Sequence, residues 1–310
     1  MLRLLIAAVL LVMSVSLAHA ATCTVHVGDL DFGQVDAIGN TPTTTVANVD
    51  ISCDFITPGT DSITVCGNIG AGSGGVDGSL RQSLSADGTL GFSLTGPDGV
   101  VPWGSTGEPG LGAPYRIDVP VSGTSATLTT QLRGAVPAGQ SSAPVGDYHS
   151  DFTGASSVFT YAEGNLDCAA PVGGADATAP FTVTASVVAN CLLETADLDF
   201  GTAGIIGSNI DAETALDITC TPGTGYGITI DGGGSNDPDN RVLRSGSNTV
   251  RYDLYSNQAR TAPWGTSAGT TVSYTGTGAQ QQLGVYGRIP PQPAAPGAYT
   301  DTVVVTITYN

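Results

Sequence analysis

The sequence predicts an all-β protein made of two tandem β-sandwiches. Three observations predict this fold class: the composition, short runs of alternating apolar residues, and an internal repeat. The chain of 310 residues contains 43 Gly and 18 Pro, and it is rich in Thr, Ser and Val. Gly and Pro favour turns, whereas Val and Thr favour extended backbone. The composition therefore indicates many short strands joined by turns.

Apolar residues alternate with small or polar residues over several short stretches. Leu90–Leu94 and Val250–Leu254 show this pattern, and so does most of Thr302–Tyr309. A period of two places alternate side chains on opposite faces of a strand, so each stretch is predicted to be a β-strand. Short strands of this kind, separated by Gly, Pro and Asn, favour a sandwich of antiparallel strands.

The internal repeat sets the number of domains. Two cysteines enclose the motif DLDFG in each half of the chain, and two further landmarks follow in the same order. This order predicts two homologous domains, 21–175 and 190–310. Residues 176–189 between them are expected to comprise a linker, formed by the small residues of Ala175–Pro180, and a candidate strand. The repeated landmarks are Cys23 with Cys191, Asp29–Gly33 with Asp197–Gly201, Cys53 with Cys220, Pro102–Gly104 with Pro263–Gly265, and Gly146–Tyr148 with Gly297–Tyr299.

The first twenty residues have the features of a signal peptide. Arg3 supplies a positive charge, Leu4–Leu17 is apolar, and Ala18–Ala20 is a small-x-small cleavage site. We therefore expect the mature chain to begin at Ala21 and to be exported to an oxidising compartment. Leu4–Leu17 is too short to span a bilayer, and no later stretch approaches about 18 continuous apolar residues. The mature chain is thus not expected to span a membrane.

The charge composition excludes nucleic-acid binding. Lysine is absent, and nine Arg stand against 27 Asp and Glu, which gives a net charge of -18. A strongly acidic chain without a basic run is repelled by phosphate backbones.

Six cysteines remain after the signal, and an even number in an exported chain predicts disulfides. The second domain contains two of them, which are expected to pair with each other. The repeat then assigns a corresponding pair to the first domain and leaves one additional pair. No CxxC or CxxH spacing suggests a zinc site. The expected pairs are Cys191–Cys220, Cys23–Cys53 and Cys66–Cys168.

Patterns associated with ligands or catalysis have simpler interpretations here. Gly70–Gly75 matches GxGxxG but does not open a helix, so a turn is expected. The acidic loop Asp231–Asn240 lacks the ligand spacing of an EF-hand. His26 and His149, the two histidines of the mature chain, leave little scope for a catalytic triad. We expect no enzyme activity, no metal and no cofactor.

A strand is predicted over residues 180–189, just before the first cysteine of the second domain. Its alternate residues form one apolar face, whereas only Ala21 and Thr22 precede Cys23 in the first domain. The segment either completes the first domain or is the first strand of the second. The residues of the apolar face are Phe181, Val183, Ala185, Val187 and Ala189.

The chain resembles the spore coat protein U domain family, most strongly over residues 190–310. The resemblance is carried by the Cys–DLDFG–Cys opening, YDLYS at 252–256, PWG at 263–265, VYGRIP at 285–290 and GAYTDTVVVTITY at 297–309. That family supplies subunits of archaic chaperone–usher pili, so the resemblance implies immunoglobulin-like sandwiches. The first domain departs from the family pattern in its last strand, around Ser157–Tyr161.

The resemblance implies donor-strand complementation, in which a subunit lacks one strand and the N-terminal extension of the next subunit supplies it. The expected mature chain has no such extension before Cys23, so the resemblance implies a fimbrial tip adhesin with its N-terminal domain outermost. Residues 180–189 are then interpreted as a donor strand used in cis, and the second domain as open until a partner strand arrives.

The resemblance also implies three assembly partners. A periplasmic chaperone is expected to cap the open domain by pairing with the last strand, and an outer-membrane usher to exchange it for the donor strand of the next subunit. The residues assigned to this last strand are Val303, Val305, Ile307 and Tyr309.

Tip adhesins of this group bind hydrophobic surfaces through apolar loops, so the resemblance implies attachment to an abiotic or host surface and biofilm formation. Candidate contacts lie in Gly- and Pro-rich loops of the first domain, whereas Trp103 is assigned to the core because Trp264 repeats it. Two alternatives are a pilus adaptor and a secreted structural coat protein with two self-complete domains. The candidate adhesive residues are Leu111, Pro114, Tyr115, Val136 and Pro137.

Overall fold

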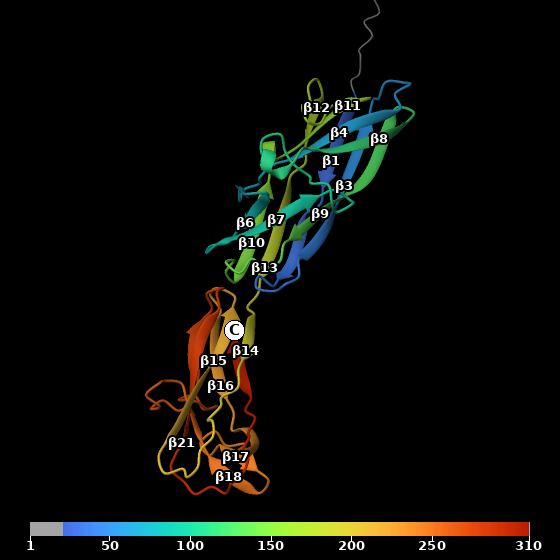
Figure 1. Cartoon of the computed structure of the whole chain (residues 1–310). Helices are drawn as coiled ribbons and strands as arrows, with labels where there is room; N and C mark the ends of the chain where they lie inside the picture. The colour runs from blue at the N-terminus through green and yellow to red at the C-terminus, as the bar shows by residue number, and fades with distance from the viewer. Residues whose placement is uncertain (1–20, 310) are drawn as a thin grey trace, which may run out of the picture.

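The computed structural model describes residues 21–309, which form two β-domains arranged end to end in an elongated molecule (Figure 1). The predicted signal peptide lies outside the described residues. Besides strands, this part of the chain contains three single-turn 3-10 helices, Pro109–Leu111, Gly154–Ser156 and Gly233–Ser235. The prediction of an all-β fold with sandwich domains is confirmed.

The N-terminal domain wraps its strands around one hydrophobic core. One face has the order β1-β3-β9-β7, and the other has β12-β11-β4-β8; β6, β10, β13 and β2 close the side. The longest ladder joins β3 to β9 along their entire lengths. The strands are β1 Thr22–Val27, β2 Leu30–Val35, β3 Thr43–Asp54, β4 Ser62–Ile69, β5 Val76–Asp77, β6 Leu80–Leu84, β7 Thr89–Thr95, β8 Tyr115–Ser122, β9 Ser125–Val136, β10 Gly146–Phe152, β11 Ser157–Glu163, β12 Ala175–Thr178 and β13 Phe181–Val187.

The C-terminal domain has a separate core between two smaller sheets. Their orders are β14-β15-β21-β19 and β20-β16-β22, and β17 and β18 form a hairpin. The strands are β14 Cys191–Thr195, β15 Ile210–Cys220, β16 Gly225–Ile230, β17 Val242–Ser245, β18 Asn248–Arg251, β19 Asp253–Tyr255, β20 Val272–Thr275, β21 Gln281–Ile289 and β22 Val305–Tyr309.

A buried tryptophan occupies the same place in both domains. Trp103 and Trp264 are 0% and 1% exposed. The indole Nε1 of Trp103 donates to the carbonyl of Gly67 at 2.8 Å, and that of Trp264 donates to Ile228 at 3.1 Å. The Pro-Trp-Gly landmark is therefore a turn anchored in the core.

Each domain also buries one arginine beside this turn, which no sequence pattern predicts. Arg81 Nη2 donates to the last carbonyl of β4 at 2.5 Å and to the carbonyl of Trp103 at 2.7 Å. Arg241 Nη2 makes the matching bonds to the end of β16 and to Trp264, both at 2.8 Å. Burial lowers the pKa of both guanidinium groups. Because the carbonyls satisfy the guanidinium donors, the arginine can lie inside the fold.

The structure contains three disulfides, the same three pairs that the repeat predicts. One joins β1 to β3, and its counterpart joins β14 to β15, in each case between residues paired across the ladder. The third fastens the loop between β11 and β12 to β4, across a sequence separation of 102. The pairs are Cys23–Cys53, Cys191–Cys220 and Cys66–Cys168.

The two domains meet at a joint formed where β13 leads into β14. The side-chain amide of Asn190 donates to Asp36 Oδ2 at 2.8 Å, and the backbone N–H of Val145 donates to the carbonyl of Pro222 at 3.0 Å. The joint lies at the opposite end of the N-terminal domain from the start of β1 (Figure 1). Loops of both domains are therefore hydrogen-bonded across the contact.

Candidate assembly site

Strand β13 lies between two strands of the N-terminal domain and pairs with both. It runs antiparallel to β10, from Phe152 opposite Phe181 to Gly146 opposite Val187. It runs parallel to β2, starting with Val183 opposite Leu30. Among the strands of residues 190–309, none pairs with it. β13 is therefore part of the N-terminal sandwich.

The inward face of β13 is buried in the N-terminal core. Phe181, Val183, Ala185 and Val187 are 4%, 1%, 5% and 1% exposed. The ring of Phe181 stacks on that of Phe152 with centroids 4.5 Å apart. Transfer energies put the burial of these four side chains at about 6 kcal/mol as an upper value, since the unfolded chain already buries part of its apolar surface.

Two details predicted for residues 176–189 are wrong. Ala175–Thr178 is not a linker, because it forms β12 and pairs with β11. Ala189 is not on the buried face, because β13 ends at Val187 and Ala189 is half-buried in the connection to β14. Pro180, which has no N–H to donate, falls between β12 and β13, where the chain passes from β11 to β10.

The aspartates of the first DLDFG motif hold β13. Asp29 Oδ1 accepts the backbone N–H of Thr182 at 2.7 Å, and Asp31 Oδ1 accepts the hydroxyl of Thr184 at 3.1 Å. Asp31 Oδ1 also accepts the N–H of Gly33 at 2.9 Å, and Gly33 has a φ of 63° that glycine adopts without strain. The sequence marked this motif as a repeated fold element but did not reveal its bonds to β13.

The second copy of the motif forms the same turn but has no strand beside it. Asp199 Oδ1 accepts the N–H of Gly201 at 2.8 Å, and Gly201 has a φ of 73°. Asp197 and Asp199 are exposed. The segment that corresponds to β10 is 297–303, and within residues 190–309 no strand lies between it and the motif.

Apolar side chains along this gap are less buried than their N-terminal counterparts. Leu30 and Phe32 are 0% and 6% exposed, whereas Leu198 and Phe200 are only partly buried. Phe152 and Phe159 are both fully buried, whereas the corresponding Val303 and Ile307 are partly buried. We call this set of partly buried side chains the open edge; it comprises Leu198, Phe200, Val303, Val305 and Ile307.

The last strand of the C-terminal domain is paired on one side. β22 pairs with β16, whereas its counterpart β11 pairs with both β4 and β12. Of the residues assigned to this strand, Val303 precedes β22, and Tyr309 is 39% exposed. Val305 and Ile307 lie in β22 and pack against the core.

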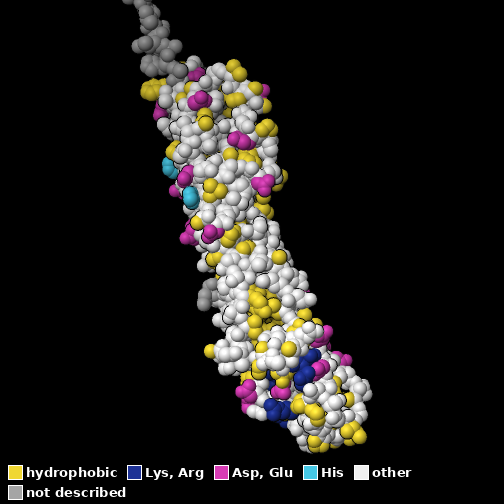
Figure 2. All heavy atoms as spheres, turned by 90° about the vertical axis from the view of Figure 1, so that its left-hand side faces the viewer, with side chains coloured by type: hydrophobic (Ala, Val, Ile, Leu, Met, Phe, Trp, Pro, Cys, Tyr) yellow, Lys and Arg dark blue, Asp and Glu magenta, His cyan; other side chains and the backbone are white. Residues whose placement is uncertain are grey.

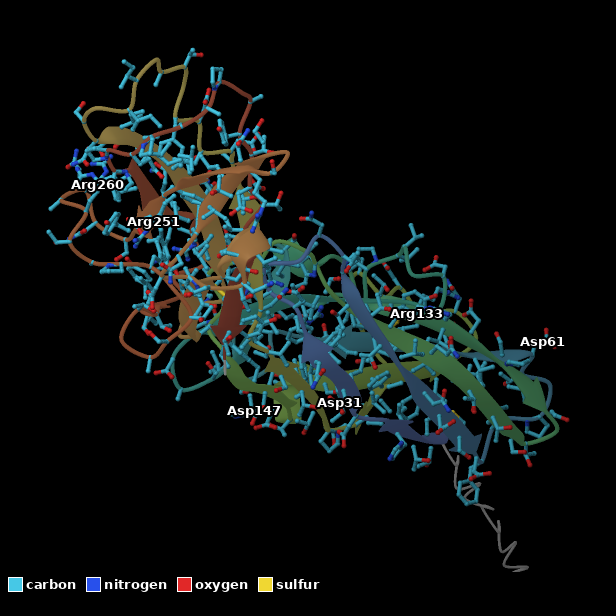
Figure 3. The ribbon with its side chains drawn as sticks, turned by 90° about the horizontal axis from the view of Figure 1, so that it is seen from below. Asp31, Asp61, Arg133, Asp147, Arg251 and Arg260 are labelled. Atoms are coloured by element: carbon cyan, nitrogen blue, oxygen red, sulfur yellow. A yellow bond between two sulfur atoms is a disulfide. The ribbon has the colours of Figure 1, made fainter. Side chains whose placement is uncertain are left out.

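The residues flanking β13 can be followed in a view from below. Asp31 on β2 and Asp147 on β10 lie on the same side of the N-terminal domain (Figure 3). Both side chains are exposed. The completing strand is thus bordered by carboxylates along its outer surface.

The loop residues predicted to contact a surface are mostly buried, so that assignment is wrong for Leu111, Pro114 and Val136. Leu111 and Val136 are 4% and 2% exposed, and Pro114 is buried too. The loop around Leu111 folds back on the Trp103 turn, where the Gly104 N–H donates to Ala113 at 3.0 Å. An apolar Gly- and Pro-rich loop here covers the core.

The other two candidate contacts are poorly placed for adhesion. Tyr115 is half-buried, and its ring stacks on Trp103 with centroids 4.7 Å apart. Pro137 is half-buried and opens the loop that reaches the joint, where Gly139 N–H donates to Gly39 at 3.2 Å. The loop therefore lies at the end of the N-terminal domain that faces the C-terminal domain.

The acidic loop Asp231–Asn240 uses its carboxylates within the chain. Asp231 Oδ1 accepts the N–H groups of Gly233 and Val304 at 2.9 and 2.8 Å. Across residues 21–309, no group of three or more His, Cys, Asp and Glu side chains is placed to hold a metal ion. No helix in the same part of the chain is long and apolar enough to cross a membrane.

Similarity to known proteins extends over both domains. Protein U of Myxococcus xanthus is 30% identical over 167 residues, which are 48% of this chain and 93% of the relative. A tip adhesion subunit complex, CsuC–CsuE from archaic chaperone–usher Csu pili of Acinetobacter baumannii, matches with a TM-score of 0.53 and 15% identity, and covers 92% of this chain and 99% of that one. The CupB6 tip adhesin from Pseudomonas aeruginosa matches with a TM-score of 0.35 and 14% identity over 93% of both chains.

The first of these structures is a complex of a pilus tip subunit with its chaperone. The spore coat protein U domain matches the chain in two segments, residues 9–154 and 177–306, so that each half of the internal repeat is covered. The chain therefore belongs to the spore coat protein U domain family.

Proposed function

We propose that the chain is the tip adhesin of an archaic chaperone–usher pilus, exported through the periplasm to the cell surface. The observation that supports this most is the contrast between β13 and the open edge. The N-terminal sandwich is completed by a strand of its own chain and needs no partner. The open edge of the C-terminal domain provides unpaired backbone and partly buried apolar side chains, which are what an added strand binds.

Export and assembly require protection of the open edge. An unpaired strand edge with apolar neighbours promotes aggregation until it is covered. We assign this protection to a periplasmic chaperone that pairs with β22, and its replacement by the next subunit to an outer-membrane usher. The similarity to a chaperone–tip adhesion subunit complex supports the chaperone assignment.

In this proposal, the end of the N-terminal domain away from the joint contacts the surface. Phe55 after β3 and Val172 in the loop before β12 are 60% and 86% exposed, and both loops lie at that end (Figure 1).

The charge of the N-terminal domain indicates which kind of surface it contacts. Residues 21–189 contain three Arg against sixteen Asp and Glu, and Figure 2 shows Arg side chains gathered in the C-terminal half of the visible face. An acidic domain is repelled by anionic surfaces, so we propose a neutral, hydrophobic surface and a role in biofilm formation.

Attachment to polystyrene by cells that carry the pilus tests this contact. We expect the pair Phe55→Ser and Val172→Ser to reduce attachment severalfold at an unchanged pilus number. Val100→Ser is the matched control, because Val100 is 77% exposed on the loop after β7. Equal attachment by the pair and the control would show that adhesion uses another region.

Strand capture by the C-terminal domain is the decisive test of the proposal. The probe is a synthetic peptide with the sequence of residues 179–190, added to the purified mature chain 21–310. We expect calorimetry to show two transitions, and the peptide to raise only the C-terminal one. A matched peptide with Phe181→Asp and Val183→Asp should leave both transitions unchanged.

A structural coat protein with two self-complete domains is the second candidate, favoured by the 30% identity to Protein U. It predicts a sharp C-terminal transition without any peptide, and no shift when the peptide is added. That result would replace the tip adhesin as the better account.

A further inference from the structure

The two aspartates of the N-terminal DLDFG motif differ in what they bind on β13. In the N-terminal copy, each aspartate bonds to β13, but to different kinds of group. Asp29 accepts a backbone N–H, that of Thr182, whereas Asp31 accepts a side-chain hydroxyl, that of Thr184. The first bond can form with almost any residue at that position, whereas the second requires a side chain that can donate a hydrogen bond, as the hydroxyl of Ser or Thr can.

The C-terminal copy already has the geometry that β13 meets in the N-terminal copy. The bond from Gly201 N–H to Asp199 Oδ1 and the positive φ of Gly201 reproduce the turn at Asp31 and Gly33. Asp197 and Asp199 are exposed, and the partly buried Leu198 and Phe200 alternate with them. The turn is therefore formed before any strand is bound beside it.

We propose that Asp199 is a specificity-determining residue of the open edge, which favours a partner strand carrying Ser or Thr at the position where β13 has Thr184. Asp197 contributes affinity for any strand, because its partner is a backbone N–H. The partner strand thus has apolar residues facing the core and a hydroxyl facing Asp199. This inference rests on the proposed function, because it requires that a strand binds to the open edge.

Alternation alone cannot provide this selection. A strand of period two buries its apolar face whichever polar residues lie on the other face, so many exported sequences meet that requirement. A hydrogen bond to a carboxylate adds a requirement on the outward face, and a partner that lacks the hydroxyl leaves the carboxylate without that bond. The open edge then distinguishes between strands of equal hydrophobicity.

The N-terminal domain provides a built-in control position. Thr182 Oγ1 donates to Asp151 Oδ1 at 3.3 Å on β10. The landmark Gly146–Tyr148 matches Gly297–Tyr299, which places the neutral Thr302 where Asp151 lies. A hydroxyl at position 182 of the strand therefore meets no carboxylate at the open edge of the C-terminal domain.

The experiment measures binding of the 179–190 peptide and its variants to the full mature chain, with a double-mutant cycle on Asp199 and Thr184. We expect Thr184→Val in the peptide to weaken binding about fivefold, in line with loss of an exposed hydrogen bond to a charged group. Thr182→Val, which removes the same atoms at the control position, should change binding less than twofold. On the Asp199→Ala chain, the original and Thr184→Val peptides should bind equally.

The possible outcomes separate this inference from the function on which it rests. If the original, Thr184→Val and Thr182→Val peptides bind the unmodified chain with one affinity, strand capture holds and the role of Asp199 is refuted. The same conclusion follows if the Thr184→Val peptide loses as much affinity for the Asp199→Ala chain as for the unmodified chain. If no peptide binds, both the strand capture and the inference are refuted. The inference is supported only if the Thr184→Val peptide binds more weakly to the unmodified chain and this loss disappears on the Asp199→Ala chain.

Discussion

The two domains share a frame but differ in how far that frame is filled. Both contain the Cys–DLDFG–Cys opening, the buried tryptophan and the buried arginine in matching places. In the N-terminal domain, β13 covers the motif and buries Leu30 and Phe32; in the C-terminal domain, Leu198 and Phe200 of the same motif stay partly buried. The motif alone therefore does not determine burial. A neighbouring strand does.

The largest effect is expected from a charge placed in the middle of β13. Val183 is 1% exposed, and Val183→Asp would bury an unpaired carboxylate between β2 and β10, which should cost the N-terminal domain more than about 4 kcal/mol. The matched change Ile307→Asp, at the partly buried open edge, should lower the C-terminal transition by less than half as much. Calorimetry of the two variants measures both effects.

Equal losses in these two variants would show that the open edge is as enclosed as the core around β13. The contrast between the domains would then lie in the backbone pairing alone. The peptide experiment would remain informative, because it measures capture of a strand rather than burial.

The second comparison concerns the loops that follow the DLDFG motif. Ile205 is matched to Ala37 by the offset of the DLDFG motif and to Ile38 by the offset of the second cysteine. Ala37 and Ile38 lie beside the joint and are 2% and 7% exposed, whereas Ile205 is 97% exposed. We expect Ile38→Asp to destabilise the N-terminal domain by about 2–3 kcal/mol, because it places a charge in a buried site. Ile205→Asp should stay within about 0.5 kcal/mol of the unmodified chain. Thermal unfolding of both variants tests the pair, and a large loss for Ile205→Asp would mean that its loop packs against the domain.

Much of the fold could be predicted because its signals are local or repeated. Alternation identifies strands such as β7 and β22, and the repeat assigns the disulfides without any knowledge of the distances. The inward face of β13 could also be predicted from alternation, up to Val187. Its neighbours could not, because pairing with β2 and β10 joins residues far apart in the chain.

The loops could not be predicted, for a physical reason that Leu111 illustrates. An apolar residue in a Gly- and Pro-rich loop can face solvent or fold back on the core, and local sequence is the same in both cases. Here the loop returns to the Trp103 turn and buries Leu111. Arg81 shows the opposite case. A charged residue is expected on the surface, but Arg81 is buried because backbone carbonyls from other parts of the chain accept its hydrogen bonds.

The smallest effect expected concerns an ion pair that the C-terminal domain alone contains. Asp211 accepts two hydrogen bonds from Arg288, at 2.7 and 2.8 Å. The two residues face each other across β15 and β21, next to the pair that contains Ile289. In the N-terminal domain, the pair next to Val136 across β3 and β9 is Thr44 with Ala135, so no ion pair forms at the matching position. The bonds from Arg288, assisted by the charge of Arg260, lower the pKa of Asp211. Since the folded chain holds the proton of Asp211 less tightly than the unfolded chain, the stabilisation is complete above the unfolded pKa and is lost as the pH falls through the folded value.

Asp211→Asn should therefore lower the stability of the C-terminal domain at pH 7 by less than about 1 kcal/mol, as for a partly exposed pair. The difference should vanish at a pH below the folded pKa, and the N-terminal transition, which serves as the internal control, should match that of the unmodified chain at every pH. A deficit that persists in acid would assign the loss to packing rather than to the charge of Asp211.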